Sequence, residues 1–217
     1  MSEKKRDAEV ITLGSGNLMI KEYNGVIPEY TEFSEETDLL GRIQGGATLE
    51  YKGTWYDAKD DSGKAVKTII TEEEATLKSG VITWNGKTLA KLCSTARVTE
   101  SGGKRTVKIG GVGNHDGKSY ALCFHHVDKA DGDVWLVIRG VNKGGFSFAF
   151  TKDKETVIDA EFMCLPQDDE GTLIQYVEEM SAEEEDEINS TAARSSSQMA
   201  MCVGIGAPPW GGDIGLL

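Results

Sequence analysis

Short apolar runs and turn-forming clusters alternate along most of this chain. The clusters SGGK, NHDG, DKADGD, NKGG, TKDK and PQDDEG separate segments rich in Val, Ile, Leu, Phe and Tyr. We expect strands at 17–23, 39–56, 65–71, 74–84, 105–112, 118–127, 133–140, 145–152, 155–165 and 172–177. Short strands between Gly- and Asp-rich turns predict an all-β fold, an antiparallel β-sandwich or barrel.

The stretch 145–152 has a regular alternation that places Phe146, Phe148 and Phe150 on one face of a strand. A single short α-helix is predicted at about 86–95. Asn85 can cap it, and Leu89 and Leu92 fall three residues apart on one side. We expect this helix to flank the sheet.

A long hairpin is predicted where two β-rich runs enclose the polar stretch DAKDDSGKAV. Hairpin loops usually need two to five residues, so the segment 52–66 indicates an extended loop with its tip near Asp60–Gly63. Residues 24–38 contain a proline and many turn formers, and we expect a loop there with at most one helical turn after Ser34.

Composition changes at both ends of the chain. Residues 1–15 form a charged, Gly-containing N-terminal arm, residues 16–178 form the β-domain, and residues 179–217 form a C-terminal appendage. The appendage is acidic, then rich in Ser, and finally apolar with many Gly and Pro residues. Its first half has too few apolar groups to fold alone, so we expect it to be ordered only in an assembly.

The formal net charge is −13, of which residues 178–217 contribute −7. An acidic chain lacks the clustered Lys and Arg that grip a phosphate backbone, so specific binding of nucleic acid is not expected. No stretch resembles a secretory signal or provides 18 consecutive apolar residues, so we expect no membrane span. The four cysteines form no C-x-x-C pair and indicate free thiols in a reducing cytoplasm.

One segment imitates a phosphate-binding loop. GGVGNHDGKS at 110–119 has Val112 where the motif needs a glycine, and a strand rather than a helix is predicted to follow it. We interpret the segment as a hairpin turn with Asp116-Gly117 at its tip.

The other candidate sites, for zinc, calcium or catalytic carboxylates, also lack the residue pattern they require. His125 and His126 are adjacent on a predicted strand and point to opposite faces, so a zinc site that combines one of them with His115 and Cys123 is disfavoured. The acidic runs Glu72–Glu74 and Asp168–Glu170 are typical of solvated edges, and Asp57, Asp60 and Asp61 lack the downstream glutamate of a calcium loop. We therefore expect no catalytic residue, no metal site, no cofactor and no enzymatic activity.

A wider pattern joins these segments. LLGRIQGGATLEYKGTWY precedes a charged hairpin tip, TIITEEEATLKSGVITW leads into the helix NGKTLAKLCST, and the body ends in FSFAFTKDKETVIDAEFMCLPQDDEGTLIQYVEE. This order resembles the tail tube (major tail) proteins of bacteriophages and phage-like particles, over about residues 15–178. Residues 179–217 depart from the simplest form of that pattern.

The resemblance implies a subunit made in a bacterial host cytoplasm that self-assembles into hexameric rings. The rings stack into the tube of a virion tail, through which DNA passes without specific binding. Sheath, tape measure or terminator proteins would be its other partners. It also implies that the long hairpin bridges adjacent rings. We expect the inter-ring contact to involve Trp55, Tyr56, Asp57, Lys59, Asp60, Asp61 and Lys64.

Two other classes of protein remain open from the sequence. A β-sandwich adhesion or carbohydrate-binding module would share the strands and could present Trp55, Tyr56, Trp84 and Trp135 to sugars. An enzyme of another type would need a site that none of the motifs above supplies. Rings or tubes in electron micrographs of the purified protein would distinguish the tube subunit from both.

Overall fold

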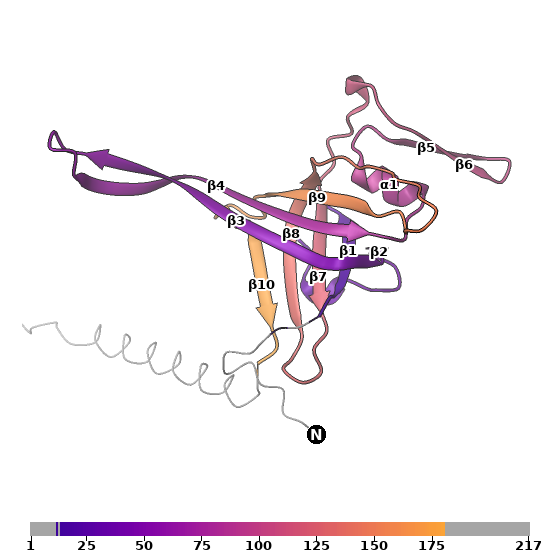
Figure 1. Cartoon of the computed structure of the whole chain (residues 1–217), viewed down its shortest axis with the longest axis horizontal. Helices are drawn as coiled ribbons and strands as arrows, with labels where there is room; N and C mark the ends of the chain where they lie inside the picture. Colours follow the sequence, from indigo (N-terminus) through magenta and orange to yellow (C-terminus); the bar gives the residue numbers. More distant parts are fainter. Residues whose placement is uncertain (1–11, 13, 181–217) are drawn as a thin grey trace, which may run out of the picture.

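The structure, a computed structural model, describes residues 12 and 14–180 (Figure 1). All but the first two residues of the predicted appendage, and most of the predicted N-terminal arm, lie outside the described residues. The elements in chain order are β1 (Asn17–Glu22), η1 (Tyr30–Glu32), β2 (Leu39–Gly41), β3 (Ile43–Lys59), β4 (Ala65–Val81), α1 (Gly86–Leu92), β5 (Arg97–Ser101), β6 (Lys104–Lys108), η2 (Val112–Asn114), β7 (Tyr120–His126), β8 (Val134–Asn142), β9 (Ile158–Leu165) and β10 (Ile174–Glu178).

One antiparallel sheet of eight strands forms the body, in the order β2-β1-β7-β8-β9-β4-β3, with β10 also paired to β8. The all-β prediction is therefore confirmed. Arg42 alone separates β2 from β3, so the strand that pairs with β1 continues directly into the strand that pairs with β4. The sheet thus folds back on itself, and β3, β4 and β9 cross steeply over β1, β7, β8 and β10 (Figure 1).

The core lies on both faces of the central strands. Leu18 and Leu122 point into the main cluster between the two crossing halves of the sheet, where Phe162 is fully buried. Met19 and Cys123, on the opposite face of the same strands, belong to a second cluster. Because both faces are covered, β1, β7 and β8 read as nearly continuous apolar runs rather than as alternating strands.

The loop between β1 and β2 covers the second cluster and is held by Lys21 and Asp38. The Lys21 ammonium donates to the Glu32 carbonyl at 2.7 Å and lies 3.3 Å from the Asp38 carboxylate. That carboxylate also accepts the Ser34 amide at 2.9 Å. Burial favours the neutral acid, but the hydrogen bond from Ser34 and the charge of Lys21 outweigh it and lower the pKa of Asp38.

The helix begins as predicted, with the Asn85 side chain accepting the amides of Lys87 and Thr88 at 2.7 and 3.2 Å. Leu89 and Leu92 are buried in the main cluster. The helix ends at Leu92 rather than near residue 95, because the backbone turns extended at the next residue.

The predicted strands differ most from the structure in three places. The expected strands 65–71 and 74–84 are one strand, β4, which ends at Val81 and continues through the acidic Glu72–Glu74 because β3 pairs with it along that whole stretch. The expected strand 145–152 pairs with no described strand. Both edges of the preceding strand β8 are already occupied, by β7 on one side and by β9 and β10 on the other.

The segment 145–152 packs by its aromatic side chains instead. The Phe148 ring lies 4.7 Å from the Trp84 ring and 5.0 Å from the Phe146 ring, centroid to centroid, and all three pack against the main cluster. Phe150 stays 78% exposed. The expected strand 105–112 is shorter in the structure, where β6 ends at residue 108. It pairs with β5, a strand that was not predicted.

Candidate functional site

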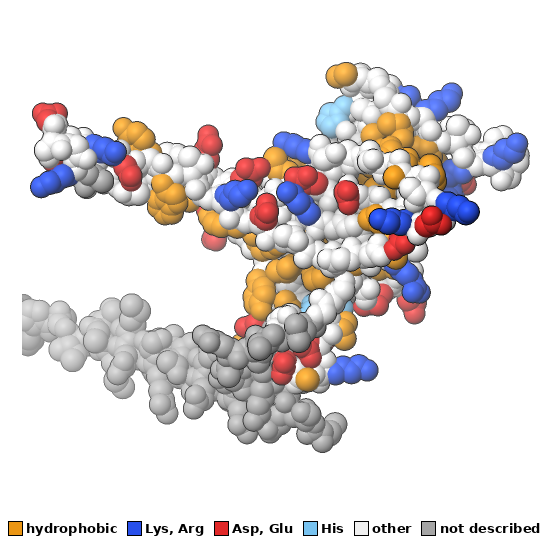
Figure 2. Space-filling view, in the orientation of Figure 1, with side chains coloured by type: hydrophobic (Ala, Val, Ile, Leu, Met, Phe, Trp, Pro, Cys, Tyr) orange, Lys and Arg blue, Asp and Glu red, His pale blue; other side chains and the backbone are white. Residues whose placement is uncertain are grey.

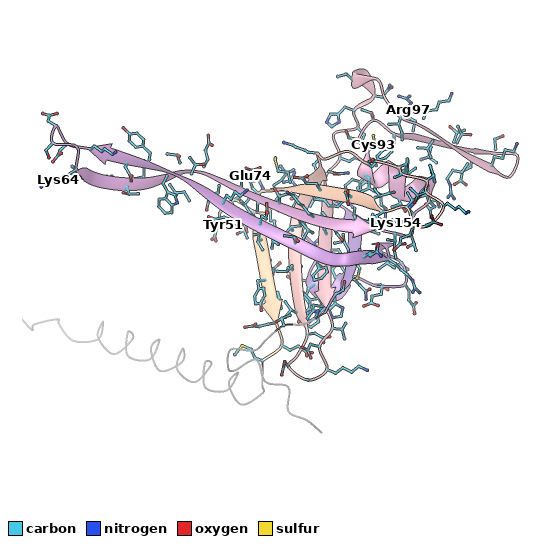
Figure 3. All side chains as sticks on the ribbon, in the orientation of Figure 1. Tyr51, Lys64, Glu74, Cys93, Arg97 and Lys154 are labelled. Atoms are coloured by element: carbon cyan, nitrogen blue, oxygen red, sulfur yellow. The ribbon has the colours of Figure 1, made fainter. Side chains whose placement is uncertain are left out.

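The hairpin of β3 and β4 projects far beyond the body (Figure 1). Strand β9 pairs with β4 only from Thr76 onward, whereas the β3–β4 ladder continues outward to the pair Lys59–Ala65. We call residues 51–75 the projecting hairpin. Figure 3 places Tyr51 and Glu74 where it leaves the body and Lys64 at its tip.

The expected long loop 52–66 is therefore mostly ladder, and only residues 60–64 form the turn. Asp60 organises this turn, as its carboxylate accepts the amides of Ser62 and Lys64 at 2.9 Å each and the Ser62 hydroxyl at 2.6 Å. The Ser62 hydroxyl and the Lys64 amide hold the pKa of Asp60 below its usual value. The tip is thus a defined turn, and the length of the projection comes from its strands.

Apolar side chains cover both faces of the projecting hairpin. Trp55 pairs with Ile70 on one face, and Tyr56 pairs with Ile69 on the other. The four side chains remain 63%, 40%, 59% and 44% exposed, respectively. A two-stranded ribbon has no interior in which to bury such groups, so this stretch of the hairpin offers apolar surface on two sides.

A glycine and a bulge set the arrangement of the Trp55 face. A Cβ added to Gly53 would lie 2.8 Å from Ile70 Cδ1 and 3.4 Å from Trp55 Nε1, so the indole and the isoleucine close over this glycine. The register shifts by one residue between the pairs Thr54–Glu72 and Trp55–Ile70, and the bulged Thr71 donates its hydroxyl to the Thr54 carbonyl at 3.0 Å. The bulge brings Ile70 opposite Trp55.

The predicted charged contacts divide into two groups. Asp57 accepts the Thr68 hydroxyl at 2.7 Å, and Asp60 holds the turn, so both carboxylates act within the hairpin. Lys59, Asp61 and Lys64 are exposed near the tip, and their side chains form no ion pair with another described residue. Sequence reasoning missed Ile69 and Ile70, although the alternation in VKTIIT carried a signal for them.

The residues of the disfavoured zinc site are separated. Cys123 is buried in the second core cluster, and His126 is buried with its Nδ1 2.9 Å from the Ser15 carbonyl. His125 lies on the same face of β7 as Cys123 and on the opposite face from His126; it is 3.0 Å from Asp133 and stacked on Trp135 with the ring centroids 4.9 Å apart. Within residues 14–180, no group of three or more His, Cys, Asp or Glu side chains is placed to hold a metal ion.

Residues 110–119, which partly match the phosphate-loop motif, lie in the connection between β6 and β7. It contains the short turn η2 and then enters β7. The expected hairpin with Asp116-Gly117 at its tip is wrong, because β6 pairs with β5 while β7 pairs with β1 and β8. The Asp116 amide instead donates to the Ser94 carbonyl at 2.9 Å.

The aromatics considered for sugar stacking form no common platform. Trp84 packs against the main cluster and Trp135 against the second cluster. Trp55 and Tyr56 point to opposite faces of the projecting hairpin.

Two of the described thiols are shielded from solvent. Burial raises the pKa of Cys123 to about 12 and that of Cys164 to about 11. Both thiols are free, as is the partly buried Cys93. The raised pKa values of Cys123 and Cys164 are the opposite of the lowered pKa by which a nucleophilic thiol is recognised.

Comparison with known proteins does not assign this chain to a family. No family model matches the chain, and no curated protein matches it. A chain from the virion of a native gene transfer agent particle aligns with a TM-score of 0.39 and 6% identity, over 74% of this chain and 95% of that one. This likeness is too weak to assign a function. No helix in the described part of the chain is long and apolar enough to cross a membrane.

Proposed function

We propose that this chain is a structural, non-enzymatic subunit that self-assembles into hexameric rings stacked as the tube of a phage or phage-like tail. DNA passes through the tube without specific binding, and sheath, tape measure or terminator proteins are its other partners. The subunit is made in the bacterial cytoplasm and resides in the virion tail. The observation that carries the proposal is the projecting hairpin with exposed apolar pairs on both faces.

A hairpin of this kind is unfavourable in an isolated subunit. Ordering each residue costs about 1–2 kcal/mol of conformational entropy, and a free two-stranded ribbon recovers little of that cost by burial. Covering the Trp55 and Tyr56 faces with a neighbouring subunit would supply the missing burial. Aromatic side chains are the residues that most often dominate such interfaces.

Open strand edges support assembly independently. Strand β3 pairs with β4 alone, and β10 pairs with β8 alone, so each has one edge that meets no other described strand. Open edges favour association, and pairing them within a closed ring of subunits removes them. Self-assembly would therefore pair strand edges that promote aggregation when they are left open in a monomer.

Truncating the projecting hairpin tests the proposal. Lys52 and Glu74 are directly opposite, so an Asn-Gly turn joining them replaces residues 53–73 and leaves the pairing of β4 with β9 intact. The variant should fold, retain the β-sheet signal in circular dichroism, and remain unassembled in sedimentation at concentrations where the full chain forms rings or tubes. Normal tubes from the truncated chain would exclude the hairpin as the stacking element.

A further inference from the structure

A second ribbon leaves the body on another side. Strands β5 and β6 pair only with each other and pack against α1 (Figure 1). A Cβ added to Gly86 would lie 2.7 Å from Arg105 Cδ and 2.8 Å from Val107 Cγ2, so the start of the helix lies directly on β6. This contact identifies the inner face of the ribbon.

The charges of the ribbon separate by face. Directly paired residues of antiparallel strands share a face. The inner face carries the pairs Val98–Val107 and Glu100–Arg105, and the Arg105 guanidinium lies 2.7 Å from the Glu100 carboxylate. The outer face carries the remaining three pairs: Arg97–Lys108, Thr99–Thr106 and Ser101–Lys104.

The outer face thus presents three cations and no acid. We call Arg97, Lys104 and Lys108 the basic face. None of the three forms an ion pair with another described residue. Basic side chains gather on this ribbon in Figure 2. In a chain of net charge −13, a face of uncompensated cations indicates an anionic partner.

The chain itself contains a matching anion. Residues 183–187 read EEEDE, five consecutive acids, and begin five residues after the end of β10 at Glu178. Five extended residues span at most about 17 Å, so the acidic run starts close to that end of β10. Figure 1 places the end of β10 on the opposite side of the body from the β5–β6 ribbon.

We propose that the acidic run 183–187 of one subunit docks on the basic face of a second copy. Because the run follows the end of β10, which lies across the body from the β5–β6 ribbon, the contact is head-to-tail and repeats from subunit to subunit, as in a filament or a stack. This inference rests on the proposed self-assembly and gives it a polarity. Nucleic acid is the less favoured occupant, because the net negative charge of the chain repels phosphates.

Carbodiimide cross-linking of the full chain tests the contact directly, since it joins lysines to carboxylates within ion-pair distance. Chains in ¹⁴N and ¹⁵N are mixed before assembly, so that mass spectrometry separates links between copies from links within one. We expect mixed-isotope links from Lys104 or Lys108 to residues 183–187, and their loss at 1 M salt, where the Debye length is about 3 Å. If only same-isotope links form, or if the basic face links to other carboxylates alone, the proposal is overturned.

Charge reversal provides the second arm. The triple variant Arg97→Glu, Lys104→Glu, Lys108→Glu should raise the concentration of half-assembly roughly tenfold, since exposed ion pairs are individually weak. Reversing Glu183, Glu184 and Glu185 to Lys should restore assembly in that background. The matched control Lys129→Glu, Lys143→Glu, Lys152→Glu removes three exposed cations elsewhere and should assemble like the wild type under equal conditions.

The outcomes separate the two proposals. If the wild type forms no assembly, the proposed function fails, whereas isotope-mixed cross-links still report on the contact. If the wild type assembles and the basic-face variant assembles equally well, the docking proposal alone fails. Binding of a 20-base-pair duplex at physiological salt that disappears in the basic-face variant would reassign this face to nucleic acid and overturn the proposal.

Discussion

Replacing Trp55 by serine should weaken assembly strongly while leaving the subunit folded. An indole of up to about 250 Å² that is 63% exposed leaves about 150 Å² for a partner to cover. At about 25 cal/mol per Å², full coverage contributes up to about 4 kcal/mol to association. Ordering of the side chain and imperfect packing offset about half of this. The remaining ~2 kcal/mol corresponds to roughly a 30-fold change in the association constant.

The effect on the isolated subunit should be much smaller. Within one chain, Trp55 packs on Ile70 and over Gly53 on an exposed ribbon. A cross-strand pair of this kind contributes at most about 1 kcal/mol, which for a chain of this size corresponds to a Tm decrease of no more than about 4 °C. Assembly and folding should therefore respond differently to the same substitution.

Sedimentation velocity over a dilution series, with thermal unfolding measured in parallel, checks this prediction. The concentration of half-assembly should rise roughly 30-fold. Phe150→Ser is the matched control, since Phe150 is an aromatic residue that is 78% exposed on the body, and it should leave assembly unchanged. If Trp55→Ser assembled at the wild-type concentration, or if Phe150→Ser impaired assembly equally, the role assigned to the projecting hairpin would be refuted.

Three further predictions follow from local contacts. Asp60→Ala should speed amide hydrogen exchange in the turn 60–64 while exchange in the body stays unchanged; equal rates in the turn would contradict the capping role. Because its pKa is lowered in the folded state, the ionised Asp38 carboxylate stabilises the fold above pH about 4. This contribution is lost as the pH falls through the folded-state pKa. The difference in Tm between wild type and Asp38→Asn should therefore shrink on acidification, and a constant difference would argue against it. Cys123 and Cys164, whose pKa values burial raises to about 12 and about 11, should resist iodoacetamide at pH 8 until the chain is unfolded. Rapid labelling of either of these two residues in the native chain, located by peptide mapping, would contradict their burial.

The sequence predicts the strands of the body well because apolar runs of strand length lie between clear turn signals. It fails where tertiary pairing decides the outcome. Residues 145–152 alternate like a strand, yet β8 has no open edge for them. The acidic Glu72–Glu74 read as an interruption, but both faces of the hairpin are in solvent there, so charged residues fit the ladder as well as apolar ones do.

The candidate site was predictable only in part. Trp55 and Tyr56 are visible as aromatics beside a polar tip. Their partners Ile70 and Ile69 depend on the register beyond the bulge at Thr71, which a local pattern does not specify. The separation of charge on the β5–β6 ribbon likewise requires the strand pairing, because Glu100 neutralises Arg105 on one face and leaves the other face basic.

Cryo-electron microscopy of the full chain at concentrations that favour assembly tests the central claim most directly. The account predicts six-subunit rings stacked along one axis, with the projecting hairpin of each subunit in contact with the adjacent ring through Trp55 and Tyr56. A monodisperse population of monomers at all concentrations would contradict the account. So would an assembly in which residues 51–75 remain in solvent.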